Sequence, residues 1–162
     1  IDLKDEMLII KTLNNFKEVD QKTLRQSAFQ SLVDQASKEV EITVNKIEIK
    51  KNIKNQALTN LEKKLKDAGI KSSRIYNKIK KKSRLDYAWN VLISNKYGWK
   101  LNVNINEIEQ KLTTLGYIDP NNPETIKEKK KLINEEKNKK FNFYSRTHLN
   151  RTKKELLIKI IK

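Results

Sequence analysis

The stretch DQKTLRQSAFQSLVDQA, residues 20–36, decides the fold class of this chain. Its apolar residues recur at spacings that place them on one face of a helix. They are Leu24, Ala28, Phe29, Leu32, Val33 and Ala36. Asp20 precedes them, and its carboxylate suits the free backbone donors at a helix N-terminus. The stretch therefore predicts an amphipathic helix that begins just after Asp20.

A second strong helical stripe lies further along the chain. Ser72 and Ser73 are expected to cap a long helix that ends near Gly98. Its apolar positions are Ile75, Ile79, Leu85, Ala88, Trp89, Leu92 and Ile93. Two long amphipathic helices are thus the minimum that the sequence predicts.

Further helices are expected on both sides of these two. They cover residues 3–15, 46–55 and 58–68, a segment from Asn104 or Asn106 to Gly116, and a charged helix from Pro123 to about Lys154. Gly69 suits the left-handed residue that follows a helix, and Pro123 suits a first helical turn. The apolar seam of the last helix is sparse and consists of Ile126, Ile133, Phe141, Tyr144 and Leu149.

Two segments are expected to be extended because β-branched residues alternate in them. The first, Val40 to Val44, is expected to be a short link, after which Asn45 caps the next helix. The second, Leu156 to Ile161, is expected to form a terminal strand. The predicted fold class is therefore mainly α, a multi-helix core with a long C-terminal helix and a short terminal β-strand.

Length and composition favour one domain over residues 1–162. The chain holds three glycines and two prolines, too few for the many turns of a sandwich or barrel. Residues 117–123 form the obvious turn-rich break, with Asp119-Pro120-Asn121-Asn122-Pro123 at its centre. The first residues, Ile1-Asp2-Leu3, begin in the middle of a helical pattern, as in a mature or trimmed product.

The chain is strongly basic, with 36 Lys and Arg against 20 Asp and Glu and a formal net charge of +16. Such a charge attracts nucleic acids, anionic membranes and acidic unfolded chains alike. Residues 46–84 hold 14 of the cations and three acids. Nucleic-acid binding through this region is the alternative function, but no recognition-helix, RNA-binding or zinc-finger signature accompanies the charge. Solvated helix faces account for it better.

The sequence contains no group of residues that indicates catalysis or a cofactor. There is no cysteine, which excludes disulfides and thiolate chemistry. His148 is the single histidine and is expected at the surface or at a helix edge. No phosphate-binding loop, nucleophile elbow or dinucleotide fingerprint occurs, and no apolar run of about 18 residues could span a membrane. We therefore expect a binding protein that uses no metal and no nucleotide.

Aromatic residues are the best candidates for a binding surface. Trp89 is expected in the core, whereas Trp99 follows Gly98 in a polar stretch and is expected to be partly exposed. Of Phe141, Phe143 and Tyr144, one is expected to be exposed, since Phe143 falls off the face that the other two share. Amphipathic rings bind varied apolar side chains while tolerating water.

The order of these elements resembles the chaperone core of SurA-like periplasmic chaperones. The segments that carry the resemblance are Thr23-Leu24-Arg25 with Phe29–Asp34, Gly69-Ile70 with Arg84–Trp89 and Ile93, and the tail formed by Lys140-Phe141, Tyr144–Arg146, Leu149 and Leu157–Ile160. The patterns are loose but cover most of the chain. The parvulin isomerase domain of the family has no counterpart here; only residues 117–123 occupy its place.

The resemblance implies an ATP-independent holdase without prolyl isomerase activity. Its expected clients are unfolded outer-membrane proteins in a bacterial periplasm, and its expected peptide contacts are Phe16, Trp99, Tyr117 and Phe143. The family's opening β-hairpin would lie before Ile1. The terminal strand would then lack a partner, and a second copy of the chain could supply one in a homodimer.

Overall fold

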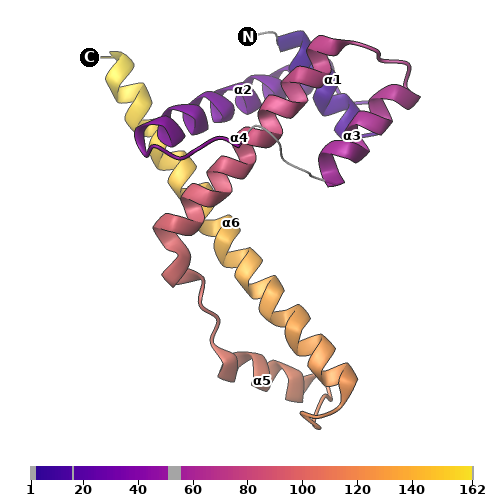
Figure 1. The fold of residues 1–162 in the computed structure, drawn as a ribbon, viewed down its shortest axis with the longest axis vertical. Coiled ribbons are helices and arrows are strands. Elements are labelled where there is room, and N and C mark those ends of the chain that lie inside the picture. Colours follow the sequence, from indigo (N-terminus) through magenta and orange to yellow (C-terminus); the bar gives the residue numbers. More distant parts are fainter. Residues whose placement is uncertain (1–2, 16, 51–55, 162) are drawn as a thin grey trace. The chain divides into compact units, whose positions relative to one another are not determined.

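The computed structural model of the chain describes residues 3–15, 17–50 and 56–161 (Figure 1). The described residues form six α-helices and one short 3-10 helix. In chain order these are α1 (Leu3–Leu13), α2 (Gln21–Val44), α3 (Gln56–Asp67), α4 (Ser73–Tyr97), η1 (Gly98–Leu101), α5 (Ile105–Thr114) and α6 (Pro123–Ile161). The mainly helical fold class is confirmed.

Several helix ends lie where the capping residues predict them. The Asp20 carboxylate accepts the Thr23 backbone N–H at 2.9 Å and so caps α2. Asn104 caps α5 by accepting the backbone N–H of Asn106. Gly69 and Gly116, which follow α3 and α5, have φ values of +74° and +87°. Such values favour glycine, because a Cβ atom is strained there.

The expected extended link at Val40–Val44 is wrong, since α2 continues through it. Each β-branched residue lowers helix stability by only about 0.5 kcal/mol, so even the run Ile42-Thr43-Val44 does not stop a helix of this length before its last turn. Asn45 ends α2 instead of beginning a helix, because its backbone N–H donates to the Glu41 carbonyl and Lys46 has a left-handed φ of 54°. Residues 47–50 are not helical. The rest of that expected helix, 51–55, lies outside the described residues.

The expected terminal strand at Leu156–Ile161 is also wrong, because α6 runs to Ile161. No glycine or proline interrupts the sequence after Pro123, so nothing ends the helix earlier. No strand occurs in 3–15, 17–50 or 56–161 that could pair with this segment. A helix satisfies its own backbone groups, whereas a lone strand does not. Pairing of two copies through such a strand therefore loses its structural basis.

The chain divides into two compact units. Unit 1 comprises Ile1–Leu92 with Leu149–Lys162, and unit 2 comprises Ile93–His148, so that α4 and α6 contribute to both. The turn-rich break lies within unit 2, where Asn122 Oδ1 accepts the backbone N–H of Glu124 at the start of α6. That residues 1–162 behave as one domain stays a prediction.

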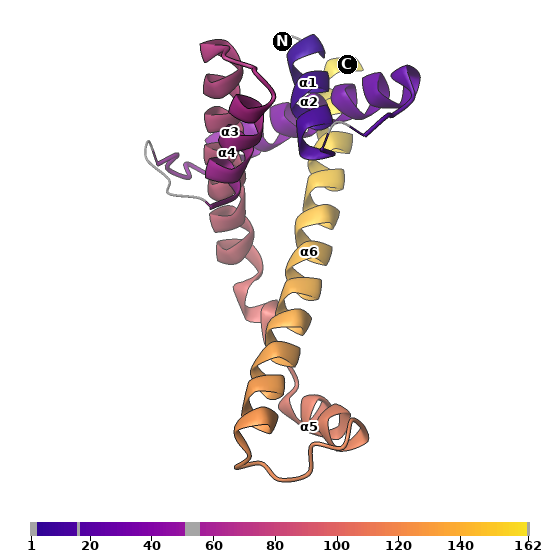
Figure 2. The same ribbon diagram turned by 90° about the vertical axis from the view of Figure 1, so that its right-hand side faces the viewer.

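Unit 1 holds an apolar core to which α1, α3 and α4 contribute. The ribbons of these helices are drawn in Figure 2. Ile9, Leu65, Ile75 and Ile79 are its buried centre. Burying each of these side chains contributes about 1.5–3 kcal/mol. Further buried apolar residues come from α2 and from the middle of α4; these are Leu24, Ala28, Ile42, Leu85, Ala88 and Trp89. The expected core position of Trp89 is confirmed.

A buried ion pair ties three helices of unit 1 together. The Glu6 carboxylate on α1 lies 2.6 Å from the Lys82 ammonium on α4. The same Glu6 oxygen accepts hydrogen bonds from Ser31 and Gln35 on α2, at 2.6 and 3.2 Å. Burial alone raises the pKa of Glu6, but these donors outweigh it and hold the pKa below its ordinary value of 4.5.

Replacement of Glu6 by glutamine should therefore destabilise the protein. In Glu6→Gln, Lys82 loses its counterion in a largely desolvated position, and we expect the free energy of unfolding to fall by about 2 kcal/mol at neutral pH. Because the folded pKa of Glu6 is depressed, the stabilisation is complete well above pH 4.5 and is lost as the pH falls through the folded pKa. Urea titrations at pH 7 and pH 3 should show the difference between wild type and variant shrinking with acid.

Glu155→Gln is the matched control. Glu155 pairs with Arg151 at 3.5 Å, and both side chains are well exposed. We expect this change to alter stability by at most about 0.5 kcal/mol. An equal loss in the two variants would contradict the special role of the buried pair.

Candidate functional site

Unit 2 contains a compact group of aromatic side chains around one lysine. We call it the ring cluster; its members are Tyr97 of α4, Trp99 and Lys100 of η1, and Phe143, Tyr144 and His148 of α6. Gly98 separates Tyr97 from Trp99, where α4 gives way to the tighter turn of η1. On α6, Tyr144 and His148 are four residues apart and thus lie on one face of the helix.

The rings meet in geometries that aromatic quadrupoles favour. Tyr97 stacks on Tyr144 with 5.1 Å between ring centroids and 12° between ring planes. Phe143 meets Tyr144 edge to face at 5.3 Å, and His148 meets Tyr97 in the same way at 5.7 Å. Such pairs contribute about 0.5–1.5 kcal/mol each beyond the burial of their area. The contacts fix the ring positions on a folded scaffold.

His148 is buried, with 1% of its surface exposed, so its expected place at the surface is wrong. Its Nδ1 shares a hydrogen bond of 3.0 Å with the Tyr97 hydroxyl. A buried imidazole is tolerated where its polar atoms have partners. Tyr97 lies 51 residues before His148 in the sequence, which explains why composition alone did not indicate that His148 is buried. The i, i+4 spacing of Tyr144 and His148 was the available signal.

Lys100 links the rings through its charge. Its Nζ lies 4.8 Å from the Trp99 ring centroid, 5.5 Å from that of Tyr144 and 5.9 Å from that of Tyr97. A cation within about 6 Å of a ring face is attracted by the quadrupole. Lys140 of α6 also donates to the Asn102 carbonyl at 2.5 Å, which fastens the segment after η1 to α6.

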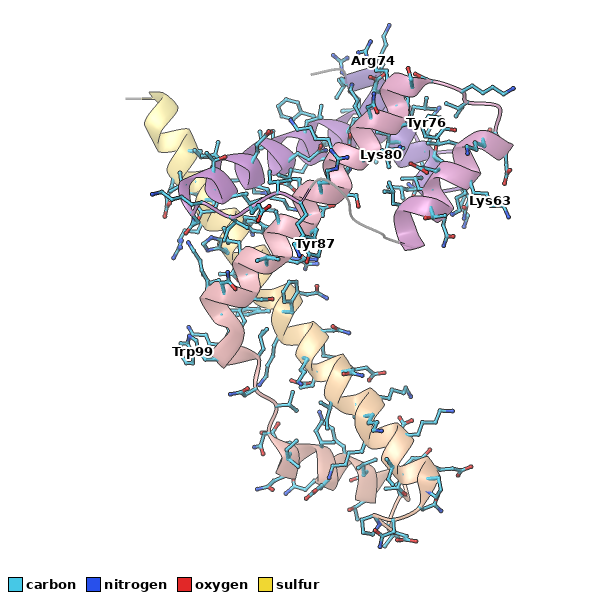
Figure 3. The ribbon with its side chains drawn as sticks, in the orientation of Figure 1. Lys63, Arg74, Tyr76, Lys80, Tyr87 and Trp99 are labelled. Atoms are coloured by element: carbon cyan, nitrogen blue, oxygen red, sulfur yellow. The ribbon has the colours of Figure 1, made fainter. Side chains whose placement is uncertain are left out.

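Two members of the ring cluster are open to solvent. Trp99 is 72% exposed and Phe143 is 63% exposed. In Figure 3 the Trp99 side chain projects away from the ribbon at the end of α4. Phe141 and Tyr144 are half-buried, so the expectation that one of the three α6 rings is exposed is confirmed.

The four expected peptide contacts are placed differently. Trp99 and Phe143 both belong to the ring cluster. Tyr117 is half-buried in the segment between α5 and α6 and makes no ring contact with another described residue. Phe16 lies outside the described residues. The structure thus brings two of the four together and adds Tyr97, Tyr144, Lys100 and His148. Of these four, sequence reasoning missed Lys100 and His148 altogether.

Unit 1 contains a small apolar pocket that the sequence did not reveal. It measures about 170 Å³. Its wall consists of Ile9, Leu13, Leu58, Leu61 and Ile79 with Lys82, Ser83 and Asp86 at one side. The wall needs α1, α3 and α4 at once, so no single stripe predicts it. The pocket is large enough for one aliphatic side chain and lies beside the buried ion pair.

Much of the positive charge of α4 is neutralised inside unit 1. Between residues 74 and 84, five of the six cations form ion pairs. Arg74 and Lys78 both pair with Asp5, Lys80 with Glu62, Lys81 with Glu39 and Lys82 with Glu6. Arg74 and Lys80 of this region are labelled in Figure 3. Unpaired charge available to phosphate groups is therefore smaller than the sequence indicates.

The expected seam of α6 is only partly correct. Ile133, Phe141, Tyr144 and Leu149 are half-buried, whereas Ile126 is exposed. Between residues 123 and 156, where the structure describes the side chains of α6, the buried positions are instead polar, namely Thr125, His148 and Thr152.

Neither a metal centre nor a membrane span emerges from the described part of the chain. There, no three His, Asp or Glu side chains come together to hold a metal ion, and none of the helices is long and apolar enough to cross a bilayer. Comparisons with protein-family models, curated proteins and solved structures find no match to this chain. The resemblance to SurA-like chaperones stays a prediction.

Removal of the Tyr97 hydroxyl should test how the ring cluster is held. Tyr97→Phe keeps the stack on Tyr144 but removes the buried hydrogen bond between the Tyr97 hydroxyl and His148 Nδ1, so we expect the free energy of unfolding to fall by about 1–2 kcal/mol. Urea titration followed by circular dichroism measures this loss. Tyr117→Phe, at a half-buried ring outside the cluster, is the control and should change stability by less than about 0.5 kcal/mol.

Proposed function

We propose that this chain is a binding module for apolar segments of other polypeptides, and that the ring cluster is its contact surface. The observation that carries the proposal is the exposure of Trp99 and Phe143 on a group of rings that is otherwise packed. Large apolar side chains left in water at one place are typical of protein interaction sites. Trp and Tyr are also the residues that dominate binding energies at such sites.

The geometry of the ring cluster favours binding of varied partners. Its rings are fixed by stacking and by Lys100, so little conformational entropy is lost when a partner binds. A ring face accepts aliphatic and aromatic side chains without specific hydrogen bonds. Lys100 adds one positive charge beside them, which favours segments that carry an acidic residue.

The resemblance to SurA-like chaperones supports a more specific form of the proposal. In these terms the chain is an ATP-independent holdase without prolyl isomerase activity, and it acts in a bacterial periplasm. Its clients are unfolded outer-membrane proteins, whose strands expose alternate apolar side chains before insertion. Weak, repeated binding of such strands requires no chemical reaction by the chain.

Nucleic-acid binding by residues 46–84 remains the alternative function. A phosphate backbone needs several cations that are free to release its counterions. The five α4 cations that pair with Asp5, Glu6, Glu39 and Glu62 are less available for this. Because these cations are already paired, we propose a polypeptide rather than a nucleic acid as the partner.

An aggregation assay tests the proposal. A chemically unfolded outer-membrane β-barrel protein is diluted into buffer of physiological salt, and light scattering is followed with increasing amounts of the chain. We expect wild type to suppress scattering. The double variant Trp99→Ser with Phe143→Ser should need about tenfold more protein for the same effect, because two contacts of more than about 1 kcal/mol are removed.

Ile118→Ser is the control variant. Ile118 is the most exposed large apolar residue among those described but lies outside the ring cluster. It should leave the suppression unchanged. Wild type that fails to suppress scattering, or equal losses in the two variants, would refute the ring cluster as the contact surface. Tight DNA binding with a steep salt dependence and no effect of the double variant would favour the alternative.

A further inference from the structure

The acidic residues of unit 2 are confined to one part of its sequence. Residues 107–136, which include α5 and the first part of α6, hold five lysines and seven Asp and Glu. Residues 93–106 and 137–148, which carry the ring cluster, hold six cations and no Asp or Glu. The six are Lys96, Lys100, Lys137, Lys139, Lys140 and Arg146. The ring cluster therefore lies among segments that carry positive charge alone.

The two parts of unit 2 also differ in how their cations are held. Lys129, near the start of α6, pairs with Glu109 of α5 at 2.7 Å, so its charge is neutralised within the unit. Lys140, beside the ring cluster, donates instead to the Asn102 carbonyl. A carbonyl orients an ammonium group but does not cancel its charge. The segments of the ring cluster thus keep a net positive charge that an anionic partner could neutralise.

Two of these cations border the exposed Phe143 ring. Lys139 lies four residues before Phe143 and Arg146 three residues after it, so both lie within about 60° of it around the helix. They share one flank of Phe143, and Tyr144 lies on the other. Both side chains are exposed, and neither forms an ion pair with an acid among the described residues. The acids at 135–136, one turn before Lys139, do not pair with it either.

The spacing of the two cations matches an extended polypeptide. Lys139 and Arg146 are seven residues apart, which is about 10 Å along the axis of α6. In an extended chain, side chains two residues apart point to the same side, and four residues span about 13 Å. Long Lys and Arg side chains cover the remaining difference. An extended segment along α6 can therefore place an apolar side chain on Phe143 and one carboxylate beside each cation.

We infer that the ring cluster selects extended segments in which an apolar residue has an acidic residue two positions before it and another two positions after it. Lys139 and Arg146 determine this selectivity, and Lys100 adds a third cation beside Trp99. The inference rests on the proposed function, because it defines which polypeptide segments the ring cluster prefers. Charge complementarity of this kind favours one class of segment over another more than it raises affinity in general.

Single-stranded nucleic acid is the other polyanion that binds exposed rings beside cations. Successive bases stack on open ring faces that lie in similar orientations. Here the Lys100 ammonium lies over the Trp99 ring at 4.8 Å, and the ring planes of Phe143 and Tyr144 are 78° apart. The geometry therefore favours separate side chains of a polypeptide over a row of stacked bases.

Binding of short dye-labelled peptides tests the inference. Three peptides share the core X-Ser-Phe-Ser-X, in which both X positions are Glu, Gln or Lys, and fluorescence anisotropy measures their affinities. The wild type should bind the Glu peptide about tenfold more tightly than the Gln peptide at low salt, because two charge pairs form. This difference should disappear near 1 M salt, where the screening length is about 3 Å.

Charge variants identify the cations responsible. Arg146→Glu should weaken binding of the Glu peptide about tenfold and change binding of the Gln peptide by less than about twofold, whereas Arg146→Lys should keep the preference. Arg146→Glu with Lys139→Glu should prefer the Lys peptide. Lys127→Glu, the same change of charge at an exposed position near the start of α6, is the control and should alter each affinity by less than about twofold.

The outcomes separate this inference from the proposed function. Equal affinities of the wild type for the Glu and Gln peptides, both lost in Trp99→Ser with Phe143→Ser, would overturn the inference and leave the proposed function standing. Binding of neither peptide would overturn both. Equal effects of Arg146→Glu and Lys127→Glu would overturn the inference, and so would a single-stranded oligonucleotide that binds through Trp99 and Phe143 more tightly than the Glu peptide.

Discussion

The ion pair of Glu6 and Lys82 is the interaction on which the arrangement of unit 1 depends. Both charges are largely removed from water, so they stay ionised only while each has its partners. The Glu6 carboxylate also takes hydrogen bonds from Ser31 and Gln35, which makes it the meeting point of α1, α2 and α4. A shift of α1 or α4 would leave a buried charge unpaired, and a shift of α2 would remove two hydrogen bonds from the Glu6 carboxylate. The pair therefore selects one register among the many that apolar stripes permit.

This dependence on polar contacts follows from a composition with few apolar residues. Several buried positions are occupied by polar rather than aliphatic side chains, and these polar side chains have hydrogen-bond partners. Thr12 donates to the Leu8 carbonyl and Ser37 to the Val33 carbonyl, each one turn back along its helix. In unit 2, His148 Nδ1 has a partner from another helix, the hydroxyl of Tyr97 on α4. Because polar side chains with hydrogen-bond partners fill part of the interior, some large apolar side chains lie at the surface instead.

Helix positions were predictable because capping and periodicity are local properties of the chain. The helix cap at Asp20 and the left-handed glycines Gly69 and Gly116 depend only on residues close to them in the sequence. The rest of the fold does not change them. The two expected extended segments were wrong because β-propensity has meaning only beside a partner strand, and none is described. The burial of His148 could not be predicted, since its partner comes from another helix. Exposed Trp99 and Phe143 were predictable, but their assembly into one cluster was not.

The distribution of charge distinguishes unit 2, which carries the ring cluster, from unit 1. Unit 1 has 25 Lys and Arg against 13 Asp and Glu, whereas unit 2 has 11 against 7. An apolar segment that binds the ring cluster therefore approaches the less charged unit, where fewer ions must lose water. Because the rings present faces rather than specific hydrogen-bonding groups, the proposed contacts at the ring cluster select apolar character rather than one sequence.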